Sequence, residues 1–167
     1  NPMVDKVSLT GSTQTGRQVM RLASDTVKKV TLELGGKSAT IILEDADLEI
    51  AVDGALFGTF FHAGQVCESG TRCFVPSSIY DEFMARIRER ITKIQLGDPM
   101  DADTSMGPLI SKAQLMTVLE YIEIGKKEGA RCTIGGRRPA HLDKGYFVEP
   151  TVFEDVTNDM TIAREEI

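Results

Sequence analysis

The sequence predicts an α/β fold with a largely parallel sheet and flanking helices. Short runs of β-branched and aliphatic residues alternate with longer segments whose apolar residues recur every three or four positions. Glycine-rich breaks separate the two kinds of segment. Strands that alternate with helices in this way are typical of parallel strands joined by crossover connections.

The first segment predicts a strand at residues 7–10, a turn at residues 11–16 that reads Gly-Ser-Thr-Gln-Thr-Gly, and a helix. The apolar side of that helix is expected to hold Val19, Met20, Leu22 and Ala23. Backbone N–H groups at a helix N-terminus after a glycine turn can face an anion. An ordinary strand-to-helix turn explains the pattern equally well.

A second strand is predicted at residues 30–34, directly before Gly35 and Gly36. Alternation along the strand puts Glu33 on the face opposite Leu32 and Leu34. A solvated strand carboxylate is the ordinary interpretation of Glu33. Its place beside a paired-glycine break also makes it a candidate general base.

Residues 39–43 form a near-continuous apolar run, which predicts a strand buried on both faces of a parallel sheet. Asp47 is the expected N-cap of the next helix. The core stripe of that helix is Leu48, Ala51, Val52, Ala55 and Leu56. The helix is expected to continue through Phe61 to Gly64 and to deliver Cys67.

Residues 71–76 predict a strand that buries Cys73 as a small core residue. Ser78 with Asp81 resembles a capping box. The helix after it has an apolar face made by Tyr80, Phe83, Met84, Ile87, Ile91 and Ile94.

The last part of the chain predicts one more helix and two extended segments. Ser111 is the expected N-cap of the helix and Gly129 its stop signal. The extended segments are residues 130–134 and residues 147–153.

One thiol stands apart from the other two. Residues 64–72 read Gly-Gln-Val-Cys-Glu-Ser-Gly-Thr-Arg, so Cys67 lies among glycines and polar residues that suit an exposed turn. A thiol and a carboxylate on separate tight turns make a plausible nucleophile and base, here Cys67 and Glu33.

Composition excludes several classes of function. The 167 residues carry a formal charge of 19 − 25 = −6 without a basic stripe, which argues against a nucleic-acid partner. No apolar run approaches the roughly 20 residues that span a membrane, and the N-terminus lacks signal-peptide form. Three scattered cysteines predict a reduced, cytoplasmic chain. With no Cys-x-x-Cys and two histidines, no metal site is expected.

Taken together, four motifs resemble the aldehyde dehydrogenase superfamily over the whole chain. Residues 32–38 match the family's glutamate signature and residues 64–67 its cysteine signature. The spacing of 67 − 33 = 34 residues is the one the family uses. Residues 11–16 match its cofactor-loop motif, and residues 163–167 match the start of a further motif.

The resemblance implies an aldehyde dehydrogenase catalytic-domain fold and a longer parent protein. Residues 1–34 would be the C-terminal part of a dinucleotide-binding domain, and residues 35–167 an incomplete catalytic domain that bears the thiol. It also implies a homo-oligomer, a dimer or a tetramer, and an inactive 167-residue fragment.

The resemblance further implies a mechanism. Cys67 would attack an aldehyde and give a thiohemiacetal, then a thioester that is hydrolysed to the acid. Glu33 would be the general base, and the backbone N–H of Cys67 would contribute to the oxyanion hole. NAD would be the cofactor, with NADP as the alternative. The positions assigned to the cofactor are Gly11, Ser12, Leu34, Gly35 and Glu166.

Two other classes remain open at this point. A cysteine-dependent acyl-transfer hydrolase would pair Cys67 with His62 or His141 and would not need nicotinamide. A non-enzymatic interaction module would carry an inert thiol. An acylating dehydrogenase that uses coenzyme A is a variant within the family, against which Glu33 argues because a hydrolytic base suits water as the acceptor.

Overall fold

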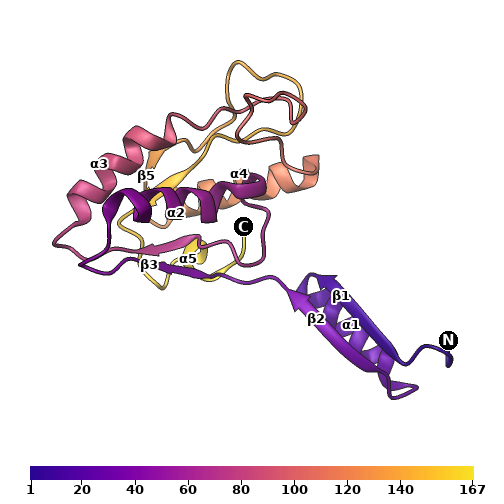
Figure 1. Cartoon of the computed structure of the whole chain (residues 1–167). Helices are drawn as coiled ribbons and strands as arrows, with labels where there is room; N and C mark the ends of the chain where they lie inside the picture. Colours follow the sequence, from indigo (N-terminus) through magenta and orange to yellow (C-terminus); the bar gives the residue numbers. More distant parts are fainter. The chain divides into compact units, whose positions relative to one another are not determined.

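The computed structural model describes all 167 residues, which divide into two compact units, Asn1–Gly36 and Lys37–Ile167 (Figure 1). The predicted α/β class is confirmed. The strands and main helices are β1 (Lys6–Gly11), α1 (Thr13–Ser24), β2 (Lys29–Leu34), β3 (Ala39–Ile41), α2 (Leu48–Phe60), β4 (Arg72–Phe74), α3 (Tyr80–Ile91), α4 (Lys112–Lys127), β5 (Arg131–Ile134) and β6 (Val152–Glu154). Two short helices, η1 (Phe61–Gly64) and α5 (Thr161–Arg164), complete the set. None of the helices has the length and apolar character required to cross a membrane.

In the first unit, β1 pairs in parallel with β2, and α1 connects them. Gly16 is buried in α1, where an added Cβ would lie 2.9 Å from the Leu34 side chain and 3.3 Å from that of Leu32. The absence of a side chain at Gly16 therefore lets α1 approach the face of β2 that carries both leucines.

The apolar side of α1 is narrower than predicted. Ala23 is buried as expected, but Met20 is 55% exposed and Leu22 is 74% exposed. Successive helical residues point about 100° apart. Leu22 is therefore turned well away from the direction of Ala23, and its place on the buried side was predicted wrongly.

In the second unit, β3 pairs in parallel with β4, and α2 and α3 lie side by side against this pair (Figure 1). The shared core consists of Ile42, Val52, Ala55, Phe83, Met84 and Ile87. The predicted core stripe of α2 and apolar face of α3 both contribute to it. Val52 has no exposed surface at all.

The prediction that residues 39–43 are buried on both faces is wrong in this chain. Ile42 is buried, whereas Ile41 is 68% and Leu43 is 64% exposed. Successive strand residues point to opposite faces. The helices cover the face to which Ile42 points, so the two flanking side chains lie on the other, uncovered face.

Local signals set the start of α2 but not its end. The Asp47 side chain accepts a hydrogen bond from the Glu49 N–H at 2.9 Å, which confirms the predicted N-cap. The helix ends at Phe60 and does not continue to Gly64, because His62 and Ala63 adopt left-handed φ values of 49° and 57°.

Two predictions around β4 are also wrong. Cys73 is exposed and is not a core residue. It lies in β4, which pairs only with β3. Ser78 does not cap α3, which begins after Ile79 without a side-chain cap. The Ser78 hydroxyl instead donates to Glu44 Oε1 at 2.7 Å, so a long-range partner replaces the local one.

The helix α4 and the strand β5 follow the prediction closely, whereas β6 (Val152–Glu154) includes only the end of the extended segment predicted at residues 147–153. Ser111 caps α4 by accepting from the Gln114 N–H at 3.1 Å, and Gly129 ends it with a φ of 97°. β5 and β6 then pair antiparallel, the one pair of this kind in the chain. A second core cluster lies under α4 and consists of Leu109, Leu115, Ile122 and Val148.

Glu154 is a buried carboxylate at the end of β6, and its side chain is 3% exposed. It accepts hydrogen bonds from Tyr80, Arg88 and Arg131. Burial alone would raise the pKa of this carboxyl, but the neighbouring side chains of Thr133, Tyr80 and Arg88 outweigh it and hold the pKa at about 2. Glu154 thus joins α3, β5 and β6 as a charged anchor.

Candidate active site

The backbone between α2 and β4 adopts a left-handed conformation within η1. His62, Ala63 and Gly64 follow one another with φ values of 49°, 57° and 78°. Non-glycine residues rarely adopt this left-handed conformation, and such residues cluster at functional sites. This left-handed stretch is followed by the segment that carries the exposed Cys67.

Cys67 and Glu68 are the two central residues of a turn, which the Ser69 N–H closes by donating to the Val66 carbonyl at 3.1 Å. Ser69 is 7% exposed, and its hydroxyl lies within 3.2 Å of two carbonyl oxygens at the C-terminal end of α2. Ser69 therefore anchors the far side of the turn to that helix.

Gln65 holds the near side of the turn. Its side-chain Nε2 donates to the His62 carbonyl at 3.1 Å, and its Oε1 accepts from the Ile110 N–H at 3.0 Å. After the turn, the Gly70 backbone lies so close to Thr40 that a Cβ added to Gly70 would be 2.0 Å from Thr40 Oγ1. The turn is pinned on both sides, and its two central side chains are exposed.

The Cys67 thiol donates to Glu68 Oε2 at 2.9 Å. This bond raises the pKa of the thiol and lowers that of the Glu68 carboxyl. Neither His62 nor His141 bonds to the thiol, so the geometry of a cysteine–histidine hydrolase is not present. Glu68 is a residue that the sequence did not identify, although its position next to Cys67 was the available signal.

A cavity of about 630 Å³ lies behind the turn. Gly64, Gln65, Gly70 and Thr71 border it, but Cys67 and Glu68 do not. The thiol therefore does not open into this cavity.

Two cations border the same cavity. The Arg72 Nε donates to the Lys37 carbonyl at 3.0 Å. Burial and the charge of Arg72 lower the pKa of Lys37 to about 8, although the carboxylate of Glu166 acts in the opposite direction. The charge of Glu166, a predicted cofactor residue, therefore acts on the Lys37 ammonium group. Its own side chain is exposed.

In the first unit, Glu33 is exposed on the face of β2 opposite Leu32 and Leu34, as the alternation predicts. The role of Glu33 as a general base stays a prediction. Leu34 and Gly35 lie at and just after the end of β2.

The β1–α1 turn fits an anionic group. Ser12 caps α1 by accepting from the Thr15 N–H at 3.2 Å, and Gly11 carries no side chain. The N–H groups of Thr13 and Gln14 have no hydrogen-bond acceptor within the chain. Unpaired N–H groups at the N-terminus of a twelve-residue helix suit the pyrophosphate of a dinucleotide.

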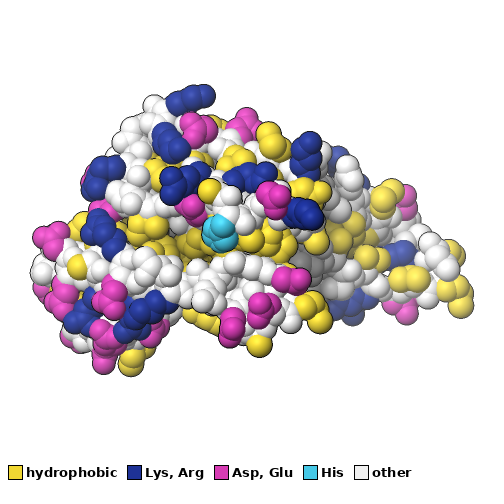
Figure 2. Space-filling view, turned by 90° about the horizontal axis from the view of Figure 1, so that it is seen from above, with side chains coloured by type: hydrophobic (Ala, Val, Ile, Leu, Met, Phe, Trp, Pro, Cys, Tyr) yellow, Lys and Arg dark blue, Asp and Glu magenta, His cyan; other side chains and the backbone are white.

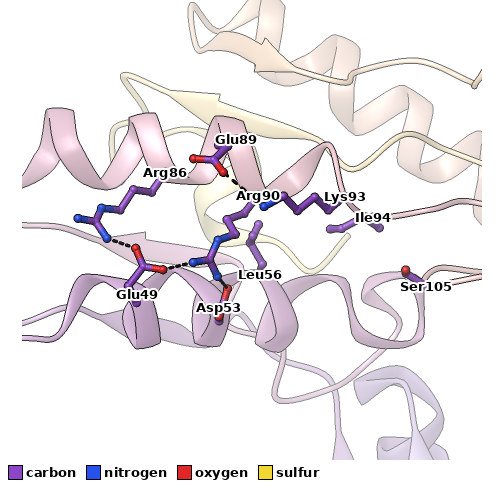
Figure 3. A pocket seen from close by; sticks show the side chains of 9 residues that line it. All are labelled: Glu49, Asp53, Leu56, Arg86, Glu89, Arg90, Lys93, Ile94 and Ser105. Atoms are coloured by element: carbon purple, nitrogen blue, oxygen red, sulfur yellow. Dashed lines mark hydrogen bonds and ion pairs between the residues drawn. The ribbon is translucent and has the colours of Figure 1, made fainter.

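A second surface pocket, of about 560 Å³, lies between α2 and α3 (Figure 3). Glu49 accepts from both Arg86 and Arg90, and Arg90 also bonds to Asp53. The charges of this cluster are paired with one another. These ion pairs link α2 to α3 and leave the pocket without an unpaired charge for a ligand.

Elsewhere, Figure 2 shows cationic and anionic side chains interspersed, with hydrophobic side chains between them. No group of three His, Cys, Asp or Glu side chains could hold a metal ion.

The model of the aldehyde dehydrogenase family matches residues 1–167 of this sequence. The chain belongs to the aldehyde dehydrogenase family. Betaine aldehyde dehydrogenase of Brucella anthropi is 55% identical over 164 residues, which cover 97% of this chain and 34% of the relative. That of Sinorhizobium fredii is 55% identical over 168 residues, with 100% and 34% covered. This aldehyde dehydrogenase chain thus spans about a third of the length of these curated relatives.

Solved structures of the family agree with the fold. An NAD+ complex of aldehyde dehydrogenase from Bacillus cereus is 52% identical with a TM-score of 0.94, over 99% of this chain and 33% of that one. Betaine aldehyde dehydrogenase from Staphylococcus aureus, also in complex with NAD+, is 46% identical with a TM-score of 0.94 and the same coverage. These agreements confirm the recognition of the family and the fold class made from the sequence motifs.

Proposed function

We propose that the natural polypeptide containing this chain oxidises an aldehyde to a carboxylic acid with NAD+ or NADP+, and that Cys67 is its nucleophile. The observation that carries the proposal is an exposed thiol on a pinned turn, within a chain that belongs to the aldehyde dehydrogenase family. The NAD+ complexes of related structures support the choice of cofactor.

In the proposed reaction the Cys67 thiol gives up its proton to water, its sulfur attacks the carbonyl carbon, and the backbone N–H of Cys67 stabilises the negative charge that develops on oxygen. When bound, NAD(P)+ supplies the acceptor of the hydride that the thiohemiacetal loses on becoming a thioester. Glu33 activates the water that hydrolyses the thioester.

Five residues are proposed to contribute to cofactor binding. Gly11, Ser12 and the free N–H groups that follow them would bind the pyrophosphate. Glu166 would bind the nicotinamide ribose, with Leu34 and Gly35 beside the ring. We propose that residues 1–34 belong to the cofactor domain and residues 35–167 to the catalytic domain.

Betaine aldehyde is the first substrate to test, because several relatives are named betaine aldehyde dehydrogenases. A homo-oligomer, dimer or tetramer, is proposed for the natural polypeptide, and light scattering coupled to size exclusion measures it. The three free thiols support a reducing, cytoplasmic location.

The experiment is a single-turnover assay of the natural polypeptide with NAD+ and betaine aldehyde. Glu33→Gln is expected to release about one equivalent of NADH per site and to retain the acyl group on Cys67, visible as a mass increase. Glu44→Gln, which removes an exposed carboxylate from the other unit, is the control and is expected to turn over normally. Full turnover by Glu33→Gln would rule out its role as base. Ester hydrolysis without nicotinamide that depends on His62 or His141 would favour the hydrolase instead.

A further inference from the structure

The side chains of Cys67 and Glu68 project together from the pinned turn. Their neighbours Val66 and Ser69 point inward, half-buried and buried respectively. Anchors on both sides leave the backbone little freedom, so the thiol and the carboxylate are held close to each other. The observed bond between Cys67 Sγ and Glu68 Oε2, at 2.9 Å, is the result.

The chemistry of this pair decides which partner keeps the proton. The ordinary pKa values of a thiol and a glutamate carboxyl differ by about four. In this pair they are moved further apart, because the bond raises the first and lowers the second. Glu68 is therefore too weak a base to deprotonate Cys67, and it accepts a hydrogen bond from a thiol that stays protonated.

We propose that Glu68 holds the Cys67 thiol in a hydrogen-bonded resting state, from which the thiol must be released before it attacks an aldehyde. Glu68 is then a positioning residue that acts through the nucleophile. The inference rests on the proposed function only in taking Cys67 as that nucleophile.

Glu68 is the side chain with the strongest influence on the thiol. The largest influence on the pKa of Cys67 is its side-chain hydrogen bond to Glu68, whose charge acts in the same direction. Although the side chain is exposed, desolvation by the adjoining chain raises the pKa of the thiol further, and the backbone N–H groups of Cys67 and Glu68 lower it. Removal of the carboxylate therefore leaves the opposing N–H groups in place.

The test measures thiol chemistry without aldehyde or nicotinamide, so its failure would not touch the proposed oxidation. The rate at which iodoacetamide alkylates Cys67 is followed by mass spectrometry from about pH 6 to about pH 10, the range in which a thiol titrates. Glu68→Gln keeps the shape of the side chain and removes its charge. Glu68→Ala removes the hydrogen-bond acceptor as well, and Glu89→Gln removes a carboxylate that pairs with Lys93.

Both Glu68 variants are expected to shift the midpoint of the rate profile to lower pH and to speed alkylation at pH 7 about three- to tenfold. Glu89→Gln is expected to leave the profile unchanged. An unchanged midpoint in both Glu68 variants, or a shift to higher pH in either, overturns the proposal. The alkylation rate of Cys132 reports folding in the same samples, because that thiol is half-buried.

Discussion

Glu154→Gln removes the charge of the most deeply buried carboxylate and keeps the shape of its side chain. In the native chain Glu154 accepts bonds from Tyr80 at 2.8 Å and from Arg131 at 3.0 Å, and it also pairs with Arg88. Both arginines are about half exposed, so water can solvate them after the change. The expected loss of folding stability therefore comes mainly from the interactions that the charged Glu154 carboxylate makes, and little of it from the arginines left without a partner.

The magnitude follows from the pKa of Glu154. Its folded value of about 2 lies below the ordinary value of about 4.3 for a glutamate. The difference corresponds to about 3 kcal/mol of folding free energy, at about 1.4 kcal/mol for each pKa unit. Because the folded pKa is depressed, this contribution is fully present above about pH 4.3 and is lost as the pH falls through about 2. About half of it should remain at pH 3.

Urea unfolding followed by far-ultraviolet circular dichroism gives the free energy of unfolding for wild type and Glu154→Gln, measured at about pH 7 and at about pH 3. The variant is expected to be less stable by about 3 kcal/mol at pH 7, and by about half as much at pH 3. Glu123→Gln, which breaks an exposed pair with Lys126, serves as the control and should change little. A loss that is absent at pH 7, or equal at the two pH values, would refute the reasoning.

Three more outcomes are expected. Gly70→Ala should lower stability by about 1–3 kcal/mol in urea unfolding, because its Cβ would meet Thr40 Oγ1, and Gly58→Ala, where a Cβ meets nothing within 4 Å, should not. Asp47→Ala should cost about 1 kcal/mol in the same assay through loss of the α2 cap, and an unchanged midpoint would contradict that role. Acylation of Lys37 followed across pH by mass spectrometry should show a midpoint near 8, whereas a midpoint like that of the exposed lysines would contradict the effect of burial and Arg72.

The features that the sequence predicted best depend on contacts within a few residues. The N-caps Asp47 and Ser111 bond to backbone N–H groups two or three positions away, so residue type and spacing were sufficient. The same holds for Gly129, whose left-handed backbone ends α4. The exposed setting of Cys67 also followed from its immediate neighbours.

The features that the sequence missed depend on distant parts of the chain. Ser78 looked like a local cap but bonds to Glu44, which lies 34 positions away. Ile41 was expected inside a wide sheet, and the strand pair that forms leaves one face uncovered. The bond between Cys67 and Glu68 depends on the rotation of two side chains within a turn, which a sequence pattern does not encode.

The measurement that tests the central claim most directly is iodoacetamide labelling of the natural polypeptide, with and without NAD+, read by mass spectrometry. The account predicts that Cys67 labels far faster than Cys73 and Cys132 and that NAD+ changes its rate. Desolvation raises the pKa of Cys73 to about 11 and also raises that of Cys132. The bond to Glu68 raises the pKa of Cys67 as well, so the faster labelling of Cys67 is expected from its release from Glu68 beside the nicotinamide. Equal labelling of all three thiols, with no effect of NAD+, would contradict the assignment of Cys67 as the nucleophile beside a nicotinamide site.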